Sequence, residues 1–562
     1  MINLLFTDAL TAIVPMRDVY VKLSKSLSRS GFLCFSLSLP ELFLPSQGIP
    51  LPQYIASIDS LSRLVRTDYT MYNAGFEYVY RLTDLVSHGY YNSLAEKFFS
   101  LSYDGLYSYA QSGILFLPLI YRDMALSHKI HDFSCLTDDE KIILRSHFLA
   151  LSLSLTCFDL VVSRQEFDFV SSFEEYSIHS LLRIHSCNIG ITHRYFTSPQ
   201  HNNIDFTRVE ISETSLTNLR RTRANLWYDR YLSFPKKISR EIFEASLNDS
   251  LYRLTGVSPH VYSPGISNIA ADRHPLYGHF NNQDAPLVLV ITSSLDERIA
   301  SSHLSSSLGE YLPNRPTPFV DQLDWLKSIY IYSIANPNIN FIVRLHPRLF
   351  KDKRGQGTSQ YYFNILSFFN NHNIPLKSHN FFICLPDNPL STYTLLLLCE
   401  LVLNGWSTVG LEALRLGIPV INAFGSNGSA CYWPSDLFPI AKSSIQYFSL
   451  IDKYFQIHEK FKSIPFNHSS FLASHYFYYY MFFSSSVEID SIDNSRTLKT
   501  CFLSPLSHQY FSLNKLTTYH ANEIDLRCAL EILRTKLTDL PLLKSSDYTL
   551  ELPILKRLEL YC

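Results

Sequence analysis

Hydroxyl and carboxylate side chains follow one another where a short apolar run passes into a predicted helix, at Trp406-Ser-Thr-Val-Gly-Leu-Glu412. The backbone N–H groups at a helix start attract an anion, and the hydroxyls of Ser407 and Thr408 add donors for phosphate oxygens. Glu412 lies one turn further along, where a carboxylate can accept hydrogen bonds from both ribose hydroxyls. The segment therefore predicts a nucleotide site. The alternative is a capping serine and a solvated glutamate that pairs with Arg415.

A histidine follows a second predicted strand, in the sequence Arg344-Leu-His346-Pro347. Ligands of open parallel sheets bind outside the carboxyl ends of the strands, which is where this segment belongs. The imidazole of His346 can donate to a phosphate oxygen or protonate a leaving phosphate, and Arg344 can add positive charge. The alternative is a histidine with a purely structural role.

Small hydroxyls follow a third predicted strand, in the sequence Thr292-Ser-Ser-Leu-Asp-Glu297. Ser293 and Ser294 are small enough to let a ligand approach the backbone closely. The alternative is a turn in which the hydroxyls cap the next helix.

All three groups must be positioned by one predicted α/β unit. Its strands are expected at 286–291, 340–345, 381–385, 401–403 and 419–423, and its helices include 321–336 and 411–416. The strand 286–291 is a continuous apolar run, which is typical of a central parallel strand. The three groups are therefore expected together at one edge of one sheet.

A second α/β unit is predicted in the N-terminal half of the chain. Strands are expected at 4–6, 32–39, 158–162 and 188–192, with helices at 16–30 and 173–185. The sequence Thr137-Asp-Asp-Glu140 is a capping box that begins a further apolar helix. Asp8 follows the first strand and His193 ends the last one. Both are candidate general bases.

Composition limits the class of protein. The 562 residues are 46% hydrophobic, 17% charged and 14% aromatic, which excludes a disordered chain. The net charge of −2, without a basic run, gives no indication of nucleic-acid binding. Ten single cysteines without a C-x-x-C pair indicate reduced thiols. No signal peptide and no membrane-spanning helix are predicted.

Several catalytic motifs are absent from the sequence. It contains no G-x-G-x-x-G, P-loop, H-E-x-x-H or G-x-S-x-G motif. No D-x-D element is present, which argues against a metal-dependent transferase of the single-domain type. We found no pair of histidines at metal-ligand spacing with a third ligand, so no metal site is predicted.

The stretch 286–424 resembles the donor-binding domain of bacterial GT-B glycosyltransferases of capsule and lipopolysaccharide biosynthesis. Teichoic-acid glycerophosphotransferases and polysialyltransferases share its motif style. The resemblance covers about a quarter of the chain and is carried by Ser293-Ser294, Asp324-Trp-Leu326, Arg344-Leu-His346-Pro347, Trp406-Ser-Thr-Val-Gly-Leu-Glu412-Ala413 and Gly417-Ile-Pro-Val420. It implies that His346, Ser407 and Thr408 hold the donor phosphates, with Glu412 near the ribose. Ser293, Ser294 and Arg344 are further candidate donor-binding residues. The first unit fits less well, because Arg194 follows His193 where these families often have glycine.

The expected fold is α/β and GT-B-like, with two Rossmann-like domains facing a cleft and a C-terminal helix crossing back to the first domain. The expected boundaries are 1–270 for the acceptor-side domain, 285–470 for the donor-binding domain and 471–562 for crossing helices and tail. The segment Tyr476-Phe-Tyr-Tyr-Tyr-Met-Phe-Phe483 fits a buried crossing helix, a membrane-interface belt or a stacking surface for acceptor sugars.

The resulting prediction is a metal-independent glycosyltransferase. It would move a sugar from a CMP-, UDP- or GDP-linked donor to a surface polysaccharide or a lipid-linked glycan, with Asp8, His193 or His346 as catalytic residues. No cofactor and no nucleic-acid partner are expected, and the enzyme would be cytoplasmic with peripheral contact to the cytoplasmic membrane. A polyol-phosphate transferase with a CDP-linked donor, a sugar-nucleotide epimerase of the same fold and a non-catalytic assembly scaffold are the alternatives.

Overall fold

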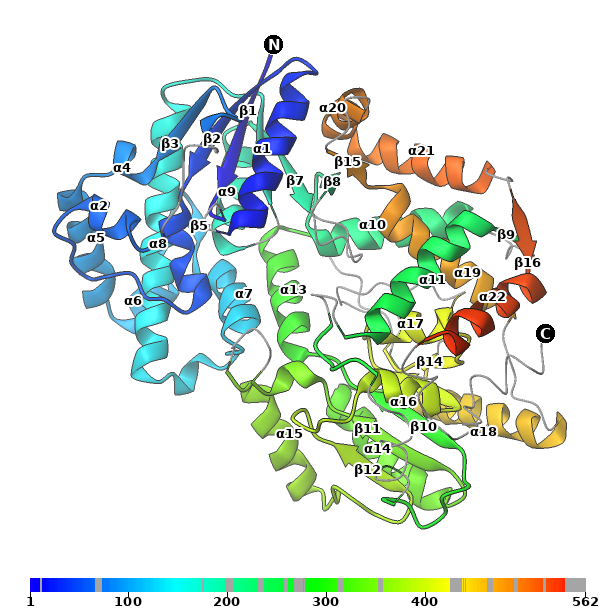
Figure 1. Ribbon diagram of the computed structural model, residues 1–562. Coiled ribbons are helices and arrows are strands. Elements are labelled where there is room, and N and C mark those ends of the chain that lie inside the picture. Colours follow the sequence, from blue (N-terminus) through cyan, green and yellow to red (C-terminus); the bar gives the residue numbers. More distant parts are fainter. Residues whose placement is uncertain are drawn as a thin grey trace.

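A computed structural model gives the architecture of the chain. It describes residues 1–562 apart from 11–12, 66–72, 174–175, 198–206, 231–236, 257–260, 267–275, 277, 311–316, 352–356, 425–436, 438, 440, 462–467, 490–493, 519–521 and 541–562. Two α/β units lie side by side, and helices from the C-terminal part of the chain return to the first (Figure 1). The expected α/β, GT-B-like fold of two Rossmann-like units is confirmed.

The first unit is built on a seven-stranded sheet with the order β15-β8-β7-β6-β1-β2-β3. The strands are β1 (Ile2–Asp8), β2 (Phe32–Ser38), β3 (Tyr78–Arg81), β6 (Phe169–Phe173), β7 (Thr192–Thr197), β8 (Arg208–Ser212) and β15 (Val487–Glu488). Five adjacent strands of this sheet are parallel, namely β7, β6, β1, β2 and β3. In contrast, β8 and β15 are antiparallel to their neighbours. The parallel part has the strand order of a Rossmann unit.

The second unit is built on a five-stranded parallel sheet with the order β12-β11-β10-β13-β14. The strands are β10 (Leu287–Ile291), β11 (Asn340–Arg344), β12 (Phe381–Cys384), β13 (Leu401–Asn404) and β14 (Val420–Asn422). Alternate residues of β10 enter two different cores: Val288 and Val290 pack on one face of the sheet, and Leu289 and Ile291 on the other. Burial on both faces explains why this strand reads as a continuous apolar run.

Helices cover both sheets, and two short strand pairs complete the fold. The helices of the first unit include α1 (Val14–Ser28), η1 (Pro40–Gln47), α2 (Ile58–Ser62), α4 (Leu82–Leu85), α5 (His88–Ser100), α6 (Tyr103–Tyr107), α7 (Leu117–Ser127), η2 (Phe133–Cys135), α8 (Asp138–Val162) and α9 (Ser177–Asn188). Those further along include α10 (Leu216–Arg230), α11 (Arg240–Leu254), α13 (Leu295–Ser307), α14 (Gln322–Ala335), η3 (Pro347–Leu349), α15 (Gln360–Asn371), α16 (Thr392–Leu398), α17 (Val409–Arg415) and α18 (Ser444–Phe461). The short pairs are β4 (Ala110–Gln111) with β5 (Ile114–Leu115), and β9 (Lys237–Ser239) with β16 (Glu523–Asp525).

The predicted boundary at residue 270 falls after α10 and α11, yet both of these helices contribute to a core of the second unit. Trp227 of α10 and Phe243 of α11 lie in the same apolar cluster as Leu289 of β10. The cluster thus joins the segment between the sheets to the second sheet.

Helix α8 corrects one prediction for the first unit. The run 158–162 was expected to be a strand, but it forms the last turns of this 25-residue helix. A short apolar run does not distinguish a buried strand from a buried helix, because both are apolar on every side. The predicted capping box at its start is confirmed: Thr137 accepts from the Glu140 N–H, and Glu140 accepts from the Thr137 N–H.

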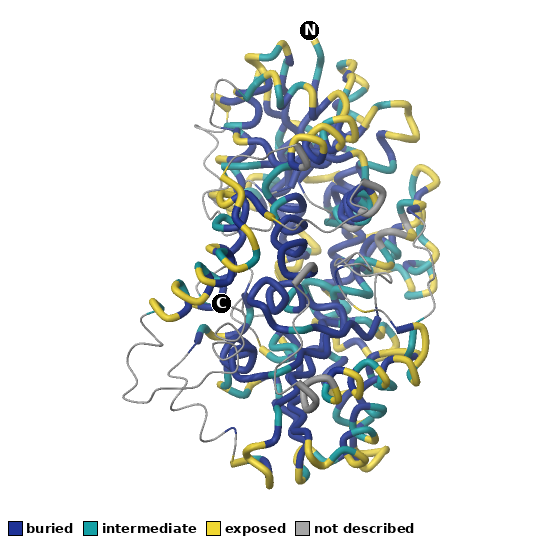
Figure 2. Tube along the Cα trace, turned by 90° about the vertical axis from the view of Figure 1, so that its right-hand side faces the viewer, coloured by how far each residue is buried: buried dark blue, intermediate teal, exposed yellow. Residues whose placement is uncertain are grey.

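Among the described residues, α8 is also the one helix long and apolar enough to cross a membrane, with a mean hydropathy of 1.3. In the structure, 78% of the most apolar 18 residues of this helix are buried inside the protein, and the helix contacts η1, α5 and α9. Figure 2 shows the buried residues along the interior of the molecule and the exposed ones along its outline. Its apolar surface is therefore accounted for by the core of the first unit.

The C-terminal segment crosses back to the first unit through α19 (His468–Tyr479), the π-helical turn η4 (Tyr480–Ser484) and strand β15. It continues as α20 (Ser495–Leu503), α21 (Pro505–Thr518) and α22 (Leu526–Thr538). The aromatic segment 476–483 is packed in the protein, since Phe477 and Tyr480 are fully buried and Tyr478 nearly so. The crossing helix is confirmed. A membrane-interface belt at this segment is disfavoured, because all of its side chains except the partly exposed Tyr479 and Phe483 are buried.

Candidate functional site

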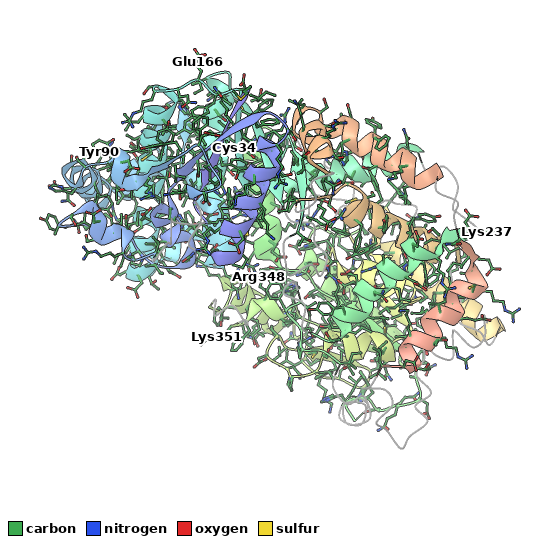
Figure 3. All side chains as sticks on the ribbon, turned by 45° about the horizontal axis from the view of Figure 1, so that its top comes forward. Cys34, Tyr90, Glu166, Lys237, Arg348 and Lys351 are labelled. Atoms are coloured by element: carbon green, nitrogen blue, oxygen red, sulfur yellow. The ribbon has the colours of Figure 1, made fainter. Side chains whose placement is uncertain are left out.

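The two units meet where α13 of the second unit packs along α7 of the first (Figure 1). α13 follows β10 closely, so its first turn stands at the carboxyl end of that strand. From the other side, the Lys129 amine donates to the Phe350 carbonyl over 2.8 Å. The Arg348 guanidinium donates to the Leu126 carbonyl at the end of α7 (Figure 3). We call this contact between residues 126–132 and the carboxyl ends of β10 and β11 the junction.

His346 is held in a defined orientation at the junction. The backbone N–H of His346 donates to the Thr292 hydroxyl over 2.8 Å, and this bond links the end of β11 to the end of β10. Its Nδ1 accepts the Arg348 N–H over 3.2 Å. Because Nδ1 is an acceptor, the proton of the neutral ring is on Nε2, and no acceptor for Nε2 is found among the described residues. The half-buried ring therefore offers one N–H donor to a ligand.

Charged side chains of both signs surround His346, because Glu297 is in an ion pair with Arg348 at 3.1 Å. Burial is the main cause that lowers the pKa of His346 to about 4. Glu297 opposes this shift, whereas Arg348, Arg344 and Lys129 contribute to it. The imidazole is consequently neutral at pH 7, and the positive charge around it resides on the arginines and the lysine.

Asp296, in the first turn of α13, is a buried carboxyl group at the junction. Its side chain is fully buried; Oδ1 accepts from the Ser359 hydroxyl over 2.8 Å, while Oδ2 has no hydrogen-bond partner among the described residues. The Nδ1 of His131, from the first unit, lies 3.7 Å from Oδ1. Burial raises the pKa of the Asp296 carboxyl to about 6, although the Ser359 hydrogen bond and Arg348 lower it.

Ser293 and Ser294 differ in what they contact. The Ser293 hydroxyl accepts the Trp406 N–H over 2.9 Å, and its N–H donates to Gln322 Oε1 over 2.8 Å, so this residue ties the end of β10 to the end of β13. A Cβ at Gly405 would lie 3.2 Å from the same hydroxyl, which explains the glycine. The buried Ser294 Oγ has no hydrogen-bond partner within the described part of the chain. Of the two, Ser294 is therefore the one with an unused polar atom.

Ser407 and Thr408 form the turn between β13 and α17. The Ser407 hydroxyl accepts the Val409 N–H over 3.3 Å, and Asn404 holds the turn through the Ser407 N–H and carbonyl. Thr408 makes no side-chain cap. The alternative of a capping serine thus describes the contacts of Ser407, and its role in donor binding stays a prediction.

Glu412 belongs to a buried network of charges. Its Oε1 accepts from Arg253 of α11 over 3.1 Å, and its Oε2 accepts from the Tyr393 hydroxyl over 2.9 Å. The alternative of a solvated glutamate paired with Arg415 is wrong, since Glu412 is buried and Arg415 pairs instead with Asp249 over 3.3 Å. The ribose role stays a prediction, but a ribose would have to share this carboxylate with two protein donors.

Arg344 contacts the loop that follows β12. Its guanidinium donates to Cys384 Sγ over 3.3 Å, to the Leu385 carbonyl and to the Asn388 carbonyl over 3.2 Å. Because its guanidinium makes these contacts, Arg344 contributes mainly positive charge near His346 and is less suited to bind a substrate directly.

Asp8 and His193 lie at opposite ends of their strands in the first sheet. Asp8 ends β1, and its Oδ1 accepts the Leu10 N–H over 2.7 Å. His193 does not end a strand as expected: α9 runs to Asn188, so β7 starts only at Thr192 and His193 is its second residue. The ring is buried with Nε2 3.1 Å from the Ser172 hydroxyl, and burial lowers its pKa well below the usual value. The position of His193 inside the sheet disfavours a role as base.

Sequence reasoning missed Lys129 and His131 as members of the site. They lie more than 160 residues from Asp296 and His346, and no motif marks them, so their role follows only from the packing of the two units. Arg348 lies only two residues after His346, so the motif around His346 could have indicated it. For the part of the chain that the structure describes, no group of three or more His, Cys, Asp or Glu side chains is placed to hold a metal ion.

No family model matches the sequence, and no curated protein matches it. Solved structures with similar chains include UDP-GlcNAc 2-epimerase from Neisseria meningitidis bound to UDP-GlcNAc, with 10% identity, 90% of this chain and 99% of that chain covered, and a TM-score of 0.29. A KpsC beta Kdo 2,7 transferase from Thermosulfurimonas dismutans has 13% identity, coverage of 52% and 78%, and a TM-score of 0.26. The S. aureus MnaA–UDP co-structure has 9% identity, coverage of 90% and 98%, and a TM-score of 0.28. With TM-scores this low, the fold assignment rests on the strand orders above.

Proposed function

We propose that this chain is a glycosyltransferase that moves a sugar from a nucleotide-activated donor, CMP-, UDP- or GDP-linked, to a polysaccharide or lipid-linked glycan of the cell surface. The observation that carries the proposal is the state of His346. A neutral imidazole presents its Nε2–H at the carboxyl edge of a Rossmann-like sheet, with three cationic side chains and one anionic side chain, Glu297, around it. A phosphate group is the ligand class that suits one such donor in a positive environment.

The donor phosphate would bind at the junction. The His346 Nε2–H would donate to a phosphate oxygen, and Lys129 and Arg348 would stabilise the negative charge that develops on the leaving nucleotide. The buried Ser294 hydroxyl is a further polar atom that a ligand could satisfy. These groups supply the charge stabilisation from the protein itself, which is why we propose a metal-independent reaction.

Asp296 is the general base in this proposal. Its Oδ2 is without a hydrogen-bond partner among the described residues and stands at the same junction, beside His131 of the other unit. With a pKa of about 6 it is ionised at pH 7 yet more basic than an ordinary aspartate, as a base for an acceptor hydroxyl requires. We prefer it to Asp8, which ends the central strand β1 of the first sheet and accepts from the Leu10 N–H there.

Incubation of the purified chain with a panel of CMP-, CDP-, UDP- and GDP-sugars, with and without an oligosaccharide acceptor, tests the proposal. We expect nucleotide release that depends on the acceptor, together with an elongated glycan. A donor whose sugar is epimerised without an acceptor would establish the epimerase alternative, and transfer of an intact polyol phosphate the phosphotransferase alternative. Failure of every nucleotide to bind, measured by calorimetry, would contradict all three.

A further inference from the structure

An exposed apolar face lies on two helices remote from the junction. Leu503 ends α20, and Leu506, Tyr510 and Phe511 follow on α21; their exposed fractions are 40%, 46%, 36% and 64%. Leu506 and Tyr510 are four residues apart in α21 and therefore lie on one side of that helix, and Leu503 stands just before its start. We call this set the α20–α21 face. Figure 1 shows both helices along the upper right edge of the molecule.

The opposite side of the same helices is well packed. Phe502 contacts the rings of Phe32 and Phe169 in the first unit, with centroids 5.6 and 5.8 Å away, and its carbonyl accepts from Arg194 Nε over 2.8 Å. In α21, Leu513 is fully buried. The core of the protein thus fixes the helices from this side.

The charge of this region has one sign. Residues 494–522 contain no aspartate or glutamate, whereas Arg496, Lys499 and Lys515 are basic. Lys499 also reaches the neighbouring helix α1, because its amine donates to the Ser30 carbonyl over 3.0 Å. The exposed Arg29, next to that contact, adds to the same basic region.

Acidic side chains of nearby strands also have to be considered. Glu213, just after β8, is in an ion pair with Arg194 at 3.1 Å, which neutralises its charge. Glu488 of β15 and, past the end of α21, Glu523 and Asp525 of β16 are exposed. These carboxylates lie on strands outside the two helices, whereas α20 and α21 themselves contain basic but no acidic residues.

We propose that the α20–α21 face docks on an anionic lipid bilayer. The four apolar side chains would enter the region between headgroups and acyl chains, and the basic side chains beside them would contact anionic headgroups, as in interfacial amphipathic helices. Basic charge beside exposed apolar residues fits an anionic membrane. Burial of the apolar side chains in lipid lowers the free energy, and the negative surface potential attracts each cation. The proposal is independent of the activity assigned to the junction.

Flotation of the full chain with vesicles tests it, using phosphatidylglycerol mixed with phosphatidylcholine and, in parallel, phosphatidylcholine alone. We expect binding to the anionic vesicles that weakens with salt. The double variant Leu506→Gln, Phe511→Gln should lose at least about tenfold in affinity, and Arg496→Gln roughly fivefold. Phe363→Gln, at a residue of α15 that is 61% exposed, is the matched control and should bind as the unmodified chain does.

Several outcomes would overturn the proposal. These are no binding to anionic vesicles, equal binding to both vesicle types, or a double variant that binds like the control. Light scattering that shows a dimer dispersed by the same double variant would assign the face to a second copy of the chain instead. Circular dichroism and the melting temperature of each variant verify that it folds, and all the substituted side chains are exposed, so folding should be retained.

Discussion

Replacing Asp296 by asparagine should stabilise the protein at neutral pH. The carboxyl is buried at the junction, and its pKa is raised to about 6 from the ordinary 3.8, so burial disfavours the ionised form. A shift of about two pKa units corresponds to roughly 3 kcal/mol, which the folded state loses when Asp296 ionises. Asparagine has a similar shape, keeps an oxygen for the Ser359 hydroxyl and carries no charge.

The gain should depend on pH in one direction. Well below pH 3.8, Asp296 is protonated in both the folded and the unfolded chain and the cost is absent. Between about pH 4 and pH 6 the unfolded chain ionises first, so stability falls as pH rises, and above pH 6 the full cost remains. Asp296→Asn should therefore raise the free energy of unfolding by about 3 kcal/mol at pH 8 and by about 1 kcal/mol at pH 4.5.

Urea unfolding at these two pH values measures the effect. The exposed Asp387→Asn is the control and should change stability by less than about 0.5 kcal/mol. If Asp296→Asn destabilises the chain, or gives the same change at both pH values, then ionised Asp296 does not destabilise the folded state. Asp296 would then no longer be a candidate for the general base. The same variant should be inactive in the transfer assay, because asparagine cannot accept the proton.

Three further predictions concern the second unit. His346→Asn keeps a side-chain acceptor for the Arg348 N–H but loses the Nε2–H donor; nucleotide binding should weaken by about 1.5–3 kcal/mol in calorimetry with little change in melting temperature. Early melting with normal nucleotide binding would make His346 structural. Glu412→Gln removes one of the two buried carboxylates that pair with Arg253, the other being Asp249, and should cost about 2 kcal/mol in urea unfolding; equal losses of affinity for ribo- and deoxyribonucleotides would then exclude the ribose role. Transfer activity should persist in excess chelator, and activity restored only by Mg²⁺ or Mn²⁺ would refute charge stabilisation by Lys129 and Arg348 alone.

The second sheet was predictable from the sequence because its strands carry strong local signals. The apolar run 287–291 is buried on both faces, and the helix after Asp321 begins with a side-chain cap from that residue to the Asp324 N–H. The first unit was harder, since α8 buries most of its surface and loses the polar stripe that marks a helix. The misplaced end of α8 and the late start of β7 led to the wrong position of His193.

The site was only partly predictable, because side-chain partners are decided by tertiary packing. His346 and the group 292–297 were found from their places after strands. Nothing local to Glu412 indicates that Arg253, from a helix more than 150 residues earlier, would lie against it. The same holds for His131, which reaches Asp296 only because α7 and α13 pack together.

The return of the C-terminal segment to the first sheet has a consequence for synthesis on the ribosome. β8 ends at Ser212, and its outer neighbour β15 begins at Val487, which is 275 residues later (487 − 212). At roughly 5–20 residues per second, the backbone edge of β8 and the apolar rings of Phe32 and Phe169 wait about 15 to 55 seconds for their partners. During that interval the nascent chain presents an open strand edge beside bare aromatic surface, a combination that invites aggregation. The first half should therefore depend on chaperones during translation, and a fragment that stops before α19 should be recovered mainly in inclusion bodies.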